Sequence, residues 1–186
     1  MGEVKNGSKG IKLMYIAELG TIICIALTLV PLINLIAAIG AFVFCVLRIV
    51  GVYQAGKEID GCKKAFILTI VSLVVSLLGF VFRSGVLSAI VSIAIDVLNF
   101  LVIYLVCSSV GQIMTQLSAP EIAKNGDTAV KINLVCYAAM AVVSILAIIP
   151  FMSGFTLILN IITTIVGIVR SVIYMLFLKK SYEKMA

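Results

Sequence analysis

The sequence predicts an all-α, polytopic membrane protein with six transmembrane helices arranged as three tandem helical hairpins. Of its 186 residues, 63% are hydrophobic and 12% are charged, whereas a soluble domain carries about 25% charged residues. Residues 19–47 and 132–169 contain no charged side chain. Because a helix needs about 20 apolar residues to cross the hydrocarbon core, each of these runs holds parts of two spans. We expect one transmembrane domain over residues 1–186.

Turn-type residues divide the apolar sequence into its spans. Pro31 and the segments 82–85 and 150–154 interrupt apolar runs, and the polar segments 54–64 and 117–131 separate one pair of spans from the next. The predicted spans are 12–30, 33–54, 65–82, 86–107, 132–149 and 156–178. Similar tripeptides that end in tyrosine occur near the end of each even-numbered span, which suggests three parallel two-helix repeats, although any hairpin protein aligns with itself at this level.

The distribution of basic residues predicts how the chain is oriented. All eleven lysines fall on one side of the predicted spans, and the other side has only Arg83. Positive residues favour the cytoplasmic side, so we expect a multi-pass protein of the plasma membrane with cytoplasmic N- and C-termini. Four tyrosines near this boundary are expected to form an interfacial aromatic belt: Tyr53, Tyr104, Tyr174 and Tyr182.

Several functional classes lack their usual residues. The chain contains no histidine, and its five cysteines show no metal-ligand spacing, so we expect no metal site and no cofactor. Cys62 is expected to be a free thiol in a loop. Hydrolase, nucleotide and metalloprotease motifs are missing, so no catalytic residues and no enzymatic activity are predicted. No basic patch with interleaved aromatics indicates nucleic-acid binding, and the expected surrounding is the lipid bilayer.

Ionisable residues inside the predicted spans form the candidate site. Each costs roughly 2.5–3.5 kcal/mol to insert in hydrocarbon, so such side chains normally face protein or water. Glu18 and Arg48 match in depth, as do Asp96 and Arg170. We therefore predict two ion pairs, Glu18–Arg48 and Asp96–Arg170. Two amides are expected to support them by hydrogen bonds: Asn99 and Asn160.

Two interpretations of this intramembrane polar cluster compete. Paired charges and small-residue stripes fix helix register in lipid, which indicates an accessory or structural membrane subunit that acts through intramembrane helix packing with a membrane-protein partner or with its own copies. This interpretation is favoured because the four charges sum to zero and could satisfy one another. The alternative is a small solute or ion transporter or channel with a polar cavity around Asp96 and Arg170.

Overall fold

The computed structural model describes residues 5–27, 34–79, 85–146 and 156–186, and almost all of these residues lie in α-helices. No strand occurs in these ranges. The helices run in chain order as α1 (Lys5–Leu27), α2 (Asn34–Ala55), α3 (Asp60–Gly79), α4 (Gly85–Gln116), α5 (Pro120–Leu146) and α6 (Thr156–Met185).

Five of these helices are long and apolar enough to cross a membrane: α1, α2, α4, α5 and α6. Helix α3 is not in this group, which was assigned from the described residues alone, and its first five residues include Asp60, Lys63 and Lys64. The prediction of an all-helical, membrane-like chain is confirmed for the described residues, and the prediction of six spans stays a prediction. Helices α4, α5 and α6 also extend well beyond their predicted spans, so most of the polar segment 117–131 is helical.

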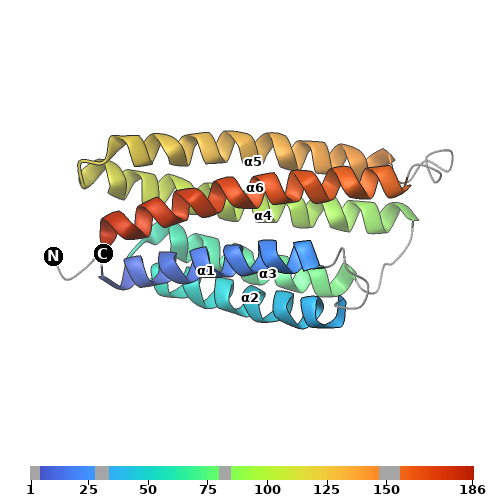
Figure 1. Cartoon of the computed structure of the whole chain (residues 1–186), viewed down its shortest axis with the longest axis horizontal. Helices are drawn as coiled ribbons and strands as arrows, with labels where there is room; N and C mark the ends of the chain where they lie inside the picture. Colours follow the sequence, from blue (N-terminus) through green and yellow to red (C-terminus); the bar gives the residue numbers. More distant parts are fainter. Residues whose placement is uncertain (1–4, 28–33, 80–84, 147–155) are drawn as a thin grey trace.

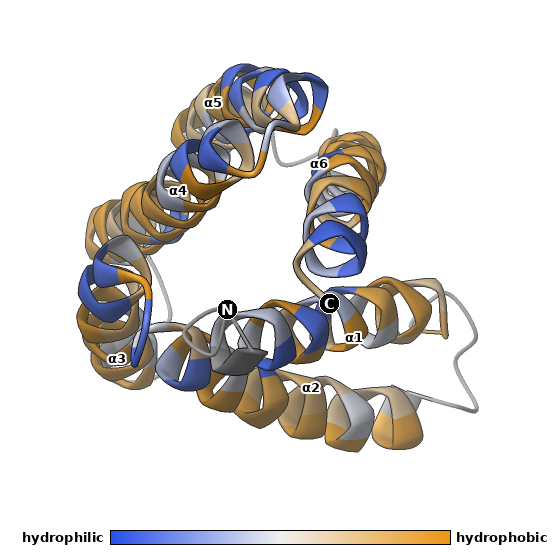
Figure 2. Ribbon diagram, turned by 90° about the vertical axis from the view of Figure 1, so that its left-hand side faces the viewer, coloured by the Kyte–Doolittle hydropathy of each residue, from blue (hydrophilic) through white to orange (hydrophobic). Residues whose placement is uncertain are grey.

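The six helices close into a ring. Each helix packs against its neighbours in sequence, and α6 packs against α1. In Figure 1, α4, α5 and α6 form one layer above α1, α2 and α3, and Figure 2 views the resulting ring from the end that holds the chain's last residue. Helix α4 contacts α5 as extensively as it contacts α3. The packing therefore does not set three hairpins apart, and the hairpin repeat stays a prediction.

The hydrophobic core lies in the half of the ring where α1 begins and α6 ends. Its members are fully or almost fully buried and come from every helix, among them Ile11, Val52, Cys62, Val106, Ala129 and Phe177. Towards the opposite end of the ring, the described buried side chains farthest from the core are small: Cys24, Ala37 and Ala89. Large apolar side chains there face outward, as a lipid-facing surface requires.

Helices α1 and α2 approach each other closely through two glycines. A Cβ atom added at Gly10 would lie 2.3 Å from the backbone nitrogen of Ala55, and one added at Gly51 would lie 2.9 Å from the carbonyl oxygen of Gly10. Contacts this short leave no room for a side chain, so the crossing needs glycine at both positions. The crossing therefore fixes how closely α1 packs against α2.

A tight turn joins α4 to α5. Ser118 has a φ of 55°, the left-handed conformation that commonly ends a helix. The Ser118 N–H donates to the Thr115 carbonyl at 3.2 Å, and the Ala119 N–H donates to the Met114 carbonyl at 2.9 Å. This is the Schellman pattern, and Pro120 follows as the first residue of α5. The turn satisfies the last carbonyls of α4 and reverses the chain within a few residues.

Cys62 is a correction to the sequence interpretation. It belongs to α3 and is completely buried in the core, not in a loop. Burial raises the pKa of the Cys62 thiol to about 12, because the thiolate would lose its hydration. Lys63 and Lys64 follow it directly, and both are exposed. Their charge gives this part of the sequence the polar composition of a loop.

Candidate functional site

The predicted pair between Glu18 and Arg48 is formed. Arg48 Nη1 lies 3.6 Å from Glu18 Oε1, and the two side chains are 25% and 6% exposed. Glu18 comes from α1 and Arg48 from α2, the two helices that cross closely at Gly10 and Gly51. An ion pair with this little hydration stabilises the fold only when further hydrogen bonds satisfy the remaining donors and acceptors of both side chains.

The predicted direct pair between Asp96 and Arg170 is not formed. The side chains of Asp96 and Arg170 are both described, and no ion-pair contact joins them. The Arg170 guanidinium instead lies over the ring of Tyr137, 4.3 Å from its centroid. Asp96 and Arg170 still interact electrostatically, but without contact. The physical reason is the ring: α4 and α6 touch only over a short stretch, while α5 packs on both and brings Tyr137 to Arg170.

Tyr137 interacts with members of both predicted ion pairs. Electrostatic interactions link its hydroxyl group to Arg170, Arg48, Glu18 and Asp96. Tyr137 is 5% exposed, and its ring packs edge-on against Phe100 with centroids 6.1 Å apart. Of the four ionisable residues inside the predicted spans, Arg170 contacts Tyr137 directly, and the other three interact with it electrostatically.

Helix α5 supplies two polar side chains that the sequence interpretation missed. Asn133 and Tyr137 are both buried, and their spacing of four residues places them on one face of α5. The Asn133 amide nitrogen donates to the Ala129 carbonyl at 2.8 Å. This i, i+4 pair of polar groups in a charge-free run is the sequence signal that points to them.

Of the two predicted supporting amides, Asn99 makes a contact other than the one expected. Ser72 Oγ of α3 donates to Asn99 Oδ1 of α4 at 3.4 Å, so Asn99 joins α4 to α3 instead of supporting Arg170. The side chain of Asn160 lies outside the described residues. Tyr174, expected in the interfacial belt, is 1% exposed inside the ring, whereas Tyr53 and Tyr104 remain exposed as predicted.

A polar pocket adjoins Arg48. It has a volume of about 230 Å³ and lies between α2, α3 and α4. Hydroxyl, amide and guanidinium groups from three helices line it together with Cys45, Ile49 and Leu73: Arg48, Thr69, Ser72, Ser76 and Asn99. Neither Asp96 nor Arg170, around which the sequence interpretation centred a cavity, lines this pocket.

Buried polar atoms without a hydrogen-bond partner distinguish this region. In the described part of the chain they are Arg48 Nε, Arg48 Nη2, Arg170 Nε, Tyr174 OH and Asn133 Oδ1. Four of these five atoms can donate a hydrogen bond, and Tyr174 OH can also accept one. A buried polar group without a partner costs about 1–3 kcal/mol, and more when the group is charged. The cluster is therefore complementary to a species rich in hydrogen-bond acceptors.

The cluster is not arranged like a metal site. The described residues contain no group of three or more cysteine, aspartate or glutamate side chains that could hold a metal ion. Glu18 is engaged with Arg48, and Asp96 lies near Arg170 without a second carboxylate beside it. The arrangement presents positive donors, and it fits a bound anion or polar molecule better than a cation.

Comparison with family models, with curated proteins and with solved structures gave no match. The geometry of the polar cluster is therefore the basis for a functional proposal.

Proposed function

We propose that the chain is a six-span integral membrane protein that binds a small anionic or acceptor-rich solute at Arg48 and moves it across the bilayer. The observation that carries this proposal is the set of unpaired buried donors at Arg48, Arg170 and Tyr174. A purely structural cluster should satisfy its own charges, because an unpaired guanidinium nitrogen away from water is destabilising. A solute carboxylate would accept from Arg48 Nε and Nη2 as a bidentate partner.

The pocket beside Arg48 supports this choice of solute. Its volume of about 230 Å³ is below the range of about 300–1,000 Å³ typical of drug-sized ligands. The hydroxyl groups of Thr69, Ser72 and Ser76 also line it, but each already donates a hydrogen bond within the protein. The unpaired Arg48 donors are therefore the groups left to bind the solute. In this proposal all six helices cross the membrane, with both termini in the cytoplasm, and the solute reaches Arg48 from within the ring.

The test uses the full chain reconstituted in liposomes with radiolabelled acetate, lactate and chloride as probes. Uptake of a probe by the wild type, its loss in Arg48→Gln and its partial retention in Arg48→Lys would support the proposal. Lys124→Gln is the matched control, because it removes one positive charge from an exposed position on α5. If no probe enters faster than into empty liposomes and none raises the melting temperature of the purified protein, transport of small anions is wrong.

A second candidate is the accessory or structural subunit. Large apolar side chains on α2 that no other helix covers favour it: Leu35 is 75% exposed and Phe42 is 71% exposed. Such a surface would pack against a membrane-protein partner or against a second copy. Purification in mild detergent followed by mass measurement of the intact complex distinguishes the two candidates. A stoichiometric partner would favour the accessory role, and a lone chain that takes up a probe would favour transport.

A further inference from the structure

We infer that the end of α2 and the start of α3 form a binding site for one anionic phospholipid, with its phosphate between Lys57 and Lys63. This site is separate from the polar cluster. It depends on membrane residence but not on solute transport, so either proposal can fail without the other.

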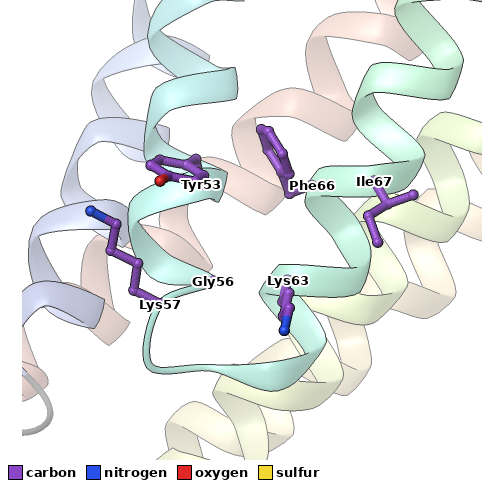
Figure 3. Close-up of a pocket in the computed structure, with 6 residues that line it drawn as sticks. All are labelled: Tyr53, Gly56, Lys57, Lys63, Phe66 and Ile67. Carbon is purple, nitrogen blue, oxygen red and sulfur yellow. The ribbon is translucent and has the colours of Figure 1, made fainter.

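The site is a pocket of about 450 Å³ between two consecutive helices. Tyr53, Gly56 and Lys57 line it from α2 and the turn that follows, and Lys63, Phe66 and Ile67 line it from α3 (Figure 3). Lys57 and Lys63 thus bring two positive charges to an otherwise aromatic and aliphatic surface. This combination matches a phospholipid, which joins a negative phosphate to acyl chains.

The level of the pocket along the helices fits the boundary between headgroups and hydrocarbon. The apolar stretch of α2 that could cross a membrane ends at Ala55, so Lys57 lies just beyond it. Lys63 precedes Phe66 and Ile67 by about one helical turn. The Lys63 ammonium group therefore reaches the level of the phosphates, and the flexible Lys57 side chain begins at that level. The rings and Ile67 remain at the level of the first acyl carbons.

Aromatic contacts hold the apolar wall of the pocket in place. The rings of Tyr53 and Phe66 are 5.3 Å apart at an interplanar angle of 54°. Lys57 Nζ lies 4.9 Å from the centroid of the Tyr53 ring, which keeps this lysine beside the pocket. Ile67 is 58% exposed, so its side chain is available to an acyl chain.

The close contact at Gly56 sets the distance between the two lysine-bearing segments. A Cβ atom added at Gly56 would lie 2.9 Å from the Lys63 nitrogen and from its Cα. The neighbouring carboxylate of Glu58 accepts a hydrogen bond from the Gly7 N–H of α1, so it is engaged away from the pocket. The charged side chains that line the pocket are therefore both lysines.

The experiment measures lipid binding to the delipidated full chain by native mass spectrometry. Phosphatidylglycerol and phosphatidylcholine are the two probes, and the variants are Lys57→Gln/Lys63→Gln and Lys57→Arg/Lys63→Arg. Because a lysine near an anionic headgroup contributes about fivefold in affinity, we expect the double glutamine variant to bind phosphatidylglycerol about 25-fold more weakly. The double arginine variant should bind it nearly as the wild type does.

The matched control is Lys124→Gln/Lys131→Gln, which removes the same charge from two exposed positions on α5. An equal loss of binding in this control would show general attraction between a basic protein and anionic lipid, and it would overturn the inference. Equal affinity of the wild type for phosphatidylcholine would also overturn it. Inorganic phosphate is the third probe: if it displaces phosphatidylglycerol at low millimolar concentration, the site binds free phosphate and not a lipid.

Discussion

Arg48 and Arg170 occupy two regions of the same ring, and their partners differ. Both arginines were predicted to face a carboxylate at the same depth. Arg48 has one, with Glu18 Oε1 3.6 Å from its guanidinium group. Arg170 lies over the Tyr137 ring and remains apart from Asp96. The two regions share the same residue types and the same reasoning from depth, and only one forms the expected contact.

The difference lies in which helices touch. Helices α1 and α2 make the most extensive contact in the ring, through Gly10 and Gly51, whereas α4 and α6 barely meet. Equal depth in the membrane is necessary for an ion pair, but it does not bring two helices together. In a closed ring, a residue on α6 meets α5 and α1 before it meets α4.

The largest effect is expected at the glycine crossing beneath the Arg48 region. Gly10→Ala would force α1 away from α2 and should lower the free energy of unfolding by about 3 kcal/mol, the upper end for overpacking. Thermal denaturation followed by circular dichroism in mild detergent measures this. Gly167→Ala on α6 is the control, because no atom lies within 4 Å of the added methyl group. It should be neutral or slightly stabilising, and equal melting of the two variants would contradict the close crossing.

Removal of each carboxylate tests the comparison directly. Glu18→Gln leaves the Arg48 charge poorly paired, and we expect a loss of about 2–3 kcal/mol, below the full range for a buried pair because Arg48 keeps some exposure. Asp96→Asn should cost less than about 1 kcal/mol, since no arginine contacts Asp96. Both are measured by the same denaturation. Equal destabilisation by the two variants would contradict the difference between the Arg48 region and the Arg170 region.

Substitution of Tyr137 tests what replaces the missing pair at Arg170. Tyr137→Leu removes the ring under the guanidinium and should cost about 1–2 kcal/mol. Tyr137→Phe keeps the ring and should recover most of that loss. A double-mutant cycle with Arg170→Gln isolates the contact. If phenylalanine is as destabilising as leucine, then the hydroxyl group and its electrostatic links matter more than the ring face.

The smallest effect is expected at Ser118, which touches neither arginine. Ser118→Gly relieves a left-handed conformation and should stabilise the protein by about 0.5–1 kcal/mol. Ser108→Gly inside α4 is the control, and it should be destabilising by a few tenths of a kcal/mol because glycine is a poor helix former. Because Ser118 touches neither arginine, substitutions in the two arginine regions should have the same effect in Ser118→Gly as in the wild type. A loss of stability in Ser118→Gly would contradict the Schellman turn.

Much of the helical layout was predictable. Helix α2 runs over Asn34–Ala55, close to the predicted span of 33–54. Helices α1 and α3 begin at Lys5 and Asp60, several residues before the predicted starts at 12 and 65. The polar segment 117–131 was misjudged because a solvated helix and a loop share the same composition. Tyr174 was placed at the interface because a tyrosine near a span end resembles a belt residue, while α6 turns this face towards the core.

The sequence by itself determined that the chain is helical, that its apolar runs suit a membrane, and that four ionisable side chains must lie among them. These conclusions depend on composition and on distance along a helix, which are local properties. Tertiary structure alone decided that α6 closes the ring on α1, that Tyr137 and not Asp96 covers Arg170, and that Arg48 keeps unpaired donors. The physical reason is that helices this uniformly apolar carry little preference for one face, so their rotation and neighbours are set by close packing between residues far apart in the chain.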